Sequence, residues 1–136
     1  MKKEVQVTMR VIIDAPKKLV WEVITNNEQF AWRSDLDRID IKSATEFIEY
    51  TKQGFSTYFT ITEKIPFETY AFSLENTNMK GSWIGTLKEF GNQTELECTE
   101  RIMVKRAFLR LLVKPYLRKQ QKQYQADLKE ALGKLI

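Results

Sequence analysis

The sequence contains no histidine and a single cysteine, Cys98, among its 136 residues. Without histidine there is no Ser-His-Asp triad, no Cys-His dyad and no zinc or iron site built on histidine. One cysteine forms neither an internal disulfide nor a cysteine-cluster metal site. Glycine (5) and proline (3) are also scarce, which excludes collagen-like and linker-like chains. The chemistry open to the chain therefore rests on carboxylates, tyrosines and arginines.

Long apolar runs are missing too. No stretch approaches the roughly 18 apolar residues that span a membrane. Polar residues interrupt the N-terminal segment, whereas a signal peptide needs about 7–15 apolar residues in a row. We therefore expect a cytoplasmic protein, and the unpaired cysteine fits a reducing compartment. Calcium loops, phosphate loops and dinucleotide fingerprints are absent, so we expect no cofactor and no metal.

Apolar and aromatic residues, in contrast, are plentiful. Hydrophobic residues make up 43% of the chain and aromatic residues 12%, which is typical of a folded rather than a disordered protein. A chain of 136 residues can build one hydrophobic core but hardly two. We find no repeat and no linker, so the sequence predicts a single domain over residues 1–136.

The formal net charge of +4 is unevenly distributed along the chain. Ten of the 22 Lys and Arg residues follow residue 100, but only two of the 18 Asp and Glu residues do. The basic character therefore belongs to the C-terminal quarter. No recognition motif accompanies these charges, so we expect no nucleic-acid partner.

Hydrophobic residues alternate with a period of two over most of the chain, which predicts strands at residues 4–14, 38–42, 45–51, 55–63, 69–75, 82–90 and 95–104. Short turns between them are typical of antiparallel hairpins. Helical spacing predicts a short helix that begins near Pro16 and ends at Thr25, and a second over Glu28–Trp32. A long helix is predicted from Lys105 to Ile136, in which Pro115 introduces a kink or a new start.

The predicted fold class is α+β. The apolar face of a seven-stranded antiparallel sheet needs a cover, and only the C-terminal helix, roughly 30 residues or about 40 Å long, is sufficient. We therefore expect a helix-grip fold, with the sheet curled around the long C-terminal helix and two short helices after the first strand. Such a helix does not touch the whole concave face, so a ligand-sized cavity is expected beside it.

Several segments resemble the SRPBCC superfamily, which includes START-like lipid-transfer domains and polyketide cyclases. They are residues 11–16 (VIIDAP), 20–25 (VWEVIT), 30–33 (FAWR), 81–83 (GSW) and 91–100 (GNQTELECTE). The final amphipathic helix resembles the grip helix of that superfamily. The likeness covers nearly the whole chain, and among the members this chain looks most like the small bacterial polyketide cyclase/dehydrase-like proteins. The resemblance implies the helix-grip fold, but a fold does not transfer an activity.

The candidate ligand-binding residues are those that strand alternation and the expected positions of the turn and helix place toward the cavity. They are Trp32, Arg33, Phe55, Phe59, Tyr70, Phe72, Trp83, Leu96, Cys98, Glu100 and Tyr124. Together they predict an aromatic-lined pocket for an apolar or planar ligand, although each one alone also fits a packed core. Cys98 has no histidine to activate it, so we interpret it as a small buried hydrophobe.

Glu100 and Arg33 are the charged members of this set. Alternation places Glu100 among apolar inward positions, where a carboxylate is costly unless it is paired or its pKa is raised. It is a candidate hydrogen-bonding group or general base; alternatively it pairs with Arg33 or an arginine of the last helix, or lies exposed near the strand end. Arg33 is a candidate for binding a ligand carboxylate; alternatively it forms a surface ion pair with Asp35 or Asp37.

Three functions fit these observations. The first, which the lack of histidine favours, is binding of a small hydrophobic molecule (a lipid, an aromatic or a polyketide-like compound) in the cavity. The second is a polyketide cyclase or dehydratase type of enzyme that uses Glu100 or a tyrosine as acid or base. The third is contact with an anionic membrane surface or a partner through Arg106, Arg110, Arg118 and Lys122. A solvated outer helix face is the alternative for these four charges.

Overall fold

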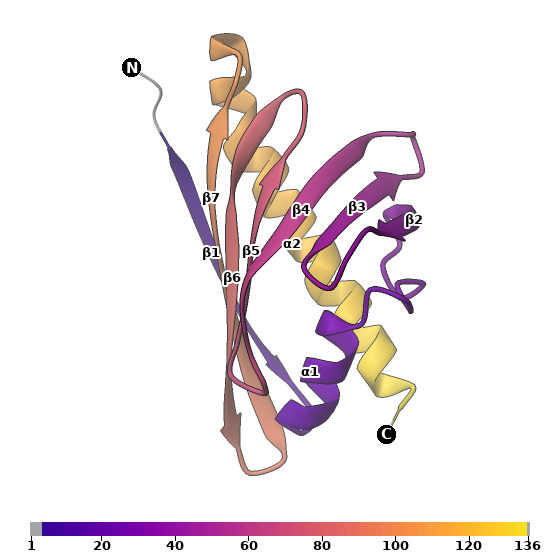
Figure 1. Ribbon diagram of the computed structural model, residues 1–136. Helices are drawn as coiled ribbons and strands as arrows, with labels where there is room; N and C mark the ends of the chain where they lie inside the picture. Colours follow the sequence, from indigo (N-terminus) through magenta and orange to yellow (C-terminus); the bar gives the residue numbers. More distant parts are fainter. Residues whose placement is uncertain (1–3, 136) are drawn as a thin grey trace.

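The structure is a computed structural model that describes residues 4–135. Residues 1–3 and 136, which the predicted domain and the predicted last helix include, lie outside the described residues. The strands are β1 Val5–Ile13, β2 Leu36–Ile41, β3 Glu46–Thr51, β4 Ser56–Ile65, β5 Thr69–Glu75, β6 Met79–Phe90 and β7 Gln93–Val104. They form one antiparallel sheet in the order β1-β7-β6-β5-β4-β3-β2, so the first strand pairs with the last. Figure 1 shows this sheet curving around a long C-terminal helix.

The helices are α1 Lys17–Thr25, a single turn of 3-10 helix η1 Ala107–Leu109, and α2 Arg110–Gly133. The α+β helix-grip architecture predicted from the sequence is confirmed. The long helix begins later than predicted, because the backbone N–H of Lys105 donates to the carbonyl of Asn78 in the β5–β6 turn, at 2.8 Å. Pro115 lies inside α2 and does not mark a new start.

The second short helix, predicted at Glu28–Trp32, is not formed. Residues 26–35 are a series of turns instead, with a backbone hydrogen bond from Arg33 N–H to the Phe30 carbonyl at 2.8 Å. A helix this short gains too little to offset its nucleation cost. Tertiary contacts fix the segment: the backbone N–H and the hydroxyl of Ser34 both donate to Oδ2 of Asp127 on α2, each at 2.9 Å. This turn segment therefore crosses from α1 to β2 against α2.

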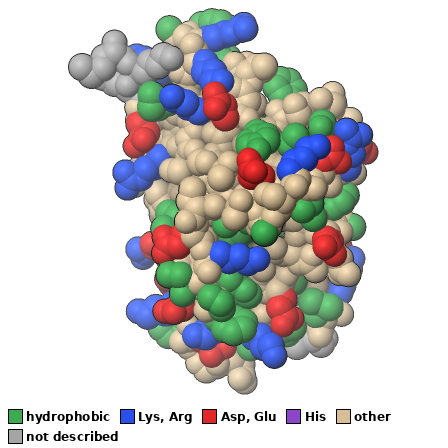
Figure 2. Space-filling view, in the orientation of Figure 1, with side chains coloured by type: hydrophobic (Ala, Val, Ile, Leu, Met, Phe, Trp, Pro, Cys, Tyr) green, Lys and Arg blue, Asp and Glu red, His purple; other side chains and the backbone are tan. Residues whose placement is uncertain are grey.

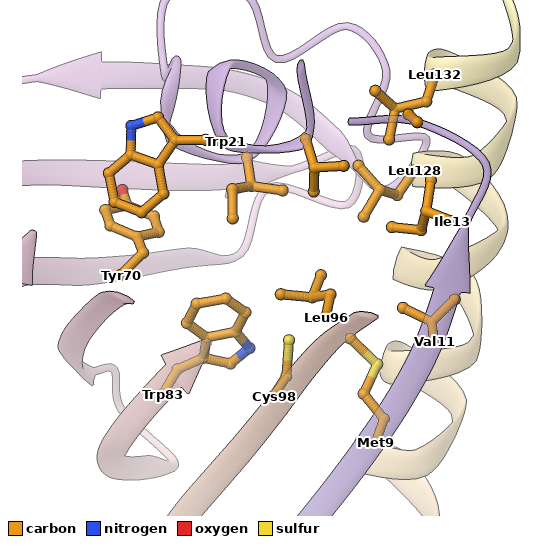
Figure 3. Close-up of a cluster of buried hydrophobic side chains, with 13 residues drawn as sticks. Met9, Val11, Ile13, Trp21, Tyr70, Trp83, Leu96, Cys98, Leu128 and Leu132 are labelled. Carbon is orange, nitrogen blue, oxygen red and sulfur yellow. The ribbon is translucent and has the colours of Figure 1, made fainter. Parts of the chain in front are cut away.

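The core divides into two clusters along the concave face of the sheet. One lies near α1 and the end of α2 and includes Trp21, Leu96, Cys98 and Leu128 (Figure 3). The other lies near the start of α2 and consists of Val7, Phe47, Phe59, Leu74, Ile102, Val104, Val113 and Leu117. The backbone of α2 approaches β1 and α1 most closely. Space consequently remains between α2 and the central strands.

Candidate functional site

A cavity of about 830 Å³ occupies the space between the sheet, α2 and the turn segment 26–35. Strands β2 to β7, together with Met9 of β1, supply its floor, and α2 supplies the opposite wall. Of the residues predicted to bind a ligand, nine line this cavity: Trp32, Arg33, Phe55, Phe59, Tyr70, Phe72, Trp83, Glu100 and Tyr124. The curvature of the sheet thus brings together residues from five elements, the turn segment 26–35 and the β3–β4 turn, far apart in the sequence.

Leu96 and Cys98 do not line the cavity. Both residues are 0% exposed and belong to the packed cluster that also contains Trp83 and Leu128 (Figure 3). They face β1 at the edge of the sheet where α2 packs most closely, with Val11 opposite Leu96 and Met9 opposite Cys98. Burial, together with the nearby Glu100 and Glu97 carboxylates, raises the pKa of the Cys98 thiol. The interpretation of Cys98 as a buried hydrophobe therefore fits its surroundings.

The cavity floor is a continuous chain of aromatic rings. Phe47 stacks on Phe59 with ring centroids 4.9 Å apart, and Phe72 stacks on Trp83 at the same distance. Phe59 and Phe72 join the two stacked pairs edge to face at 5.1 Å. Tyr124 of α2 continues the chain from Trp83, at 6.2 Å. Such a surface suits a planar or aromatic ligand, because offset and edge-to-face ring contacts add to the burial of apolar area.

Arg33 joins the turn segment to β3 in a half-buried ion-pair cluster. Its guanidinium donates to both Asp35 carboxylate oxygens at 3.2 and 3.1 Å, and lies 3.6 Å from Oε2 of Glu49. The same guanidinium packs on the Tyr124 ring, 5.3 Å from its centroid. Burial alone would lower the pKa of Arg33, but Glu49 and Asp35 outweigh it and the pKa is raised. The predicted pair with Asp35 is therefore present, but it belongs to the cavity wall and not to the surface.

Glu100 projects into the cavity and is paired with an amide instead of a cation. Nε2 of Gln121 on α2 donates to Oε1 of Glu100 at 3.2 Å and to the carbonyl of Val7, also at 3.2 Å. Burial raises the pKa of Glu100, although the Gln121 hydrogen bond and the more distant charge of Arg33 act in the opposite direction. The predicted partner Arg33 pairs with Asp35 and Glu49 instead of Glu100. The result is a carboxyl group with an increased tendency to hold its proton.

Among the polar residues that the sequence did not single out are Glu49 and Gln121, which line the cavity, and Asp127, which holds the turn segment against α2. Glu49 follows Phe47 by two positions on β3 and faces the cavity with a side chain only 15% exposed. The same period-two alternation that predicts an inward position for Glu100 also predicts one for Glu49. Burial raises the pKa of Glu49, while Arg33 lowers it. Gln121 and Asp127 are buried on α2, and nothing in the helical spacing distinguishes them from solvated neighbours.

Between residues 4 and 135, no helix is long and apolar enough to cross a membrane. No group of three or more Cys, Asp or Glu side chains in that range is placed to hold a metal ion. The ionisable side chains that line the cavity are Arg33, Asp35, Glu49, Lys52, Tyr70, Glu100, Tyr116 and Tyr124.

No family model and no curated protein matches the sequence. Solved structures do. A START superfamily protein from Mycobacterium smegmatis superimposes with a TM-score of 0.88 at 12% identity, over 96% of this chain and 99% of that one. A conserved protein from Geobacillus kaustophilus gives 0.84 at 9% identity, over 96% of both chains. The Zhui aromatase/cyclase from Streptomyces sp. R1128 gives 0.83 at 12% identity, over 95% and 93%. These likenesses establish the fold: the chain has the SRPBCC-like helix-grip fold of START superfamily and polyketide aromatase/cyclase proteins.

Proposed function

We propose that the protein binds a small, largely apolar molecule with an aromatic or planar part in the cavity between the sheet and α2. The observation that carries this proposal is the cavity of about 830 Å³ with its chain of ring contacts from Phe47 to Tyr124. Its size falls in the range of about 300–1,000 Å³ typical of small-molecule sites. Burial of apolar ligand area would supply most of the affinity, at about 25 cal/mol per Å² before the costs of association.

The polar groups of the cavity favour a ligand without a net negative charge. Arg33 already faces two carboxylates, Asp35 and Glu49, so its positive charge is compensated before any ligand arrives. Glu100 and the hydroxyl of Tyr70 remain to orient a ligand oxygen. The Tyr70 hydroxyl is buried, and the Asn27 side chain is its polar neighbour, although the two do not meet in good hydrogen-bonding geometry. Such a hydroxyl gains when a ligand supplies a well-placed partner.

Native mass spectrometry of the purified protein, followed by solvent extraction, tests the proposal directly. Ile39→Trp narrows the cavity that Ile39 lines and is expected to lower ligand occupancy at least fivefold. Ile41→Trp is the matched control, because Ile41 lies on the same strand but is 48% exposed and does not line the cavity. Absence of any bound or bindable apolar compound in the wild type, or equal loss in both variants, contradicts the proposal.

An enzyme of the cyclase or dehydratase type is the second candidate, and the position of Glu100 supports it. A cavity-lining carboxyl group with a raised pKa is suited to protonate or deprotonate a bound ligand. One of the similar structures is an aromatase/cyclase. If a substrate is found among the extracted compounds, Glu100→Gln should reduce turnover by about 10²-fold or more while binding is retained. Unchanged turnover in that variant excludes Glu100 as the acid or base.

A further inference from the structure

A group of exposed apolar side chains lies where η1 leads into α2. Phe108 is 68% exposed, Leu111 87%, Leu112 62% and Tyr116 49%. Their spacing of three, four and eight positions from Phe108 places them on one side of the helical segment. Scattered single apolar residues are normal on a protein surface, but a contiguous set of this kind marks a contact surface. We call these four residues the apolar tip.

The apolar tip lies at the opening of the cavity. Leu112 and Tyr116 are exposed and at the same time line the cavity. Phe55 in the β3–β4 turn does both as well, at 51% exposure. The cavity therefore reaches the surface between this turn and the start of α2. In Figure 1, η1 and the first turns of α2 form the upper end of the molecule. Whatever covers the apolar tip also covers the route into the cavity.

The charges that the chain carries along the apolar tip itself are all positive. Between Glu100 and Asp127 the sequence has eight Lys and Arg residues and no acidic residue. Arg106 and Lys114, which flank the tip, are both exposed, while Lys105 pairs with Glu75 at 2.7 Å. Figure 2 shows several Lys and Arg side chains at this upper end with an acidic side chain beside them, and both kinds of charge over the rest of that face.

An apolar surface framed by cations is complementary to an anionic lipid surface, where the apolar residues enter the acyl boundary and the cations meet the head groups. A second copy of the chain fits less well. A two-fold interface on the apolar tip would bring Arg106 and Lys114 toward the same residues of the partner, and like charges oppose that contact.

We propose that residues 106–116 dock the protein on an anionic lipid bilayer, and that apolar ligands exchange between the bilayer and the cavity at this opening. The docking surface stands on the exposure and charge of these residues. Only the exchange of ligand rests on the proposed function of the cavity. An experiment can therefore contradict the docking surface without contradicting ligand binding, and the reverse.

Flotation with vesicles tests the docking surface. The full chain is mixed with phosphatidylcholine vesicles, with and without about 30% phosphatidylglycerol. Wild-type protein is expected to float with the anionic vesicles and at least tenfold less with the neutral ones. Leu111→Asp should lose at least tenfold in binding to the anionic vesicles, and Arg106→Glu with Lys114→Glu should lose a similar amount. Leu135→Asp is the matched control, because Leu135 is an exposed leucine (58%) at the other end of the same helical region.

The outcomes separate the alternatives. Failure of the wild type to float with anionic vesicles, or an equal loss in Leu135→Asp, overturns the docking surface. So does a concentration-dependent dimer in analytical ultracentrifugation that Leu111→Asp dissociates, because the apolar tip then joins two copies. Leu111 does not line the cavity, so Leu111→Asp should retain its bound ligand in native mass spectrometry. Ile39→Trp should lose the ligand but still float, which distinguishes a failed cavity proposal from a failed docking surface.

Discussion

Glu100 is a carboxyl group whose surroundings disfavour its charged form. Because burial raises its pKa, the folded protein holds this proton more tightly than the unfolded chain. The stability from this proton is fully present below the unfolded pKa and is lost as the pH rises through the folded pKa. We therefore expect Glu100→Gln to increase the free energy of unfolding by about 1 kcal/mol at about pH 8, with the difference vanishing near pH 4.

Urea denaturation across this pH range measures the effect. Glu95→Gln is the control, since it removes a carboxylate from the outer face of the same strand, β7. A constant difference between wild type and Glu100→Gln at all pH values would show that the proton of Glu100 is not linked to folding.

Arg33 neutralises two carboxylates in the cavity wall, Asp35 and Glu49. Its removal should therefore lower the free energy of unfolding. Its side chain is 18% exposed and that of Glu49 is 15% exposed, so Arg33→Met leaves a half-buried Glu49 without its cation. Breaking a buried pair from one side costs about 3–5 kcal/mol, and we expect Arg33→Met to lose about 3 kcal/mol.

The double variant Arg33→Met with Glu49→Gln provides the internal control. It should recover at least about half of that loss, because the remaining partner is then neutral. Urea denaturation of the two single variants and the double variant completes the cycle. Additive effects of the two substitutions would mean that Arg33 and Glu49 are not coupled.

These residues also show how far the sequence predicts the site. Period-two alternation assigns a residue to a face of the sheet, which was sufficient to place Phe59, Trp83 and Glu100 toward α2. It does not say how close the helix comes to each strand. Leu96 and Cys98 share the face of Glu100 on β7, yet side chains of α1, α2 and the neighbouring strand β1 pack around them and leave no space. The partners of a polar group, such as Gln121 for Glu100, depend on the rotation and register of a distant helix.

Among the elements, the strands were predicted to within a few residues because alternation and turn residues agree along most of their length. The turn segment 26–35 was predicted incorrectly, since the aromatic residues in it suggested a helix while its conformation depends on Asp127, almost a hundred residues later. The local spacing of apolar residues reports only the intrinsic conformational preference of a segment. Where a segment is short, the contacts made by the rest of the chain decide its structure.

The proline inside α2 weakens the part of that helix that borders the cavity opening. Pro115 has no N–H to donate to the carbonyl of Leu111, and such a proline costs a helix interior about 3 kcal/mol. Part of this is offset because proline restricts the unfolded chain, by up to about 1 kcal/mol. We expect Pro115→Ala to stabilise the protein by about 1–2 kcal/mol and to slow amide hydrogen exchange in residues 110–118.

Pro16→Ala is the matched control for this change. Pro16 occupies the N-cap of α1, a position where an N–H has no acceptor within the helix, so its replacement should not stabilise the protein. If both alanine variants raise the midpoint of urea denaturation equally, the effect belongs to proline composition and not to α2.

At the scale of the whole molecule, the cavity divides the core, and a ligand would join its two halves. The cluster near α1 and the cluster near the start of α2 meet across the rings of the cavity floor. A molecule bound only by the folded state stabilises it by about 2.7 kcal/mol when present at about 100 times its Kd. If the purified protein carries its ligand, stripping should therefore lower Tm by about 5–10 °C for a domain of this size.

Calorimetry of the protein as purified, and of protein unfolded in guanidinium, extracted with solvent and refolded, measures this difference. Ile39→Trp is the control, because a variant that holds little ligand should show nearly the same Tm before and after extraction. Returning the extracted compound should restore the higher Tm of the wild type. An unchanged Tm after extraction, together with a native mass spectrum of the bare chain, would mean that the two halves of the core hold together without a ligand between them.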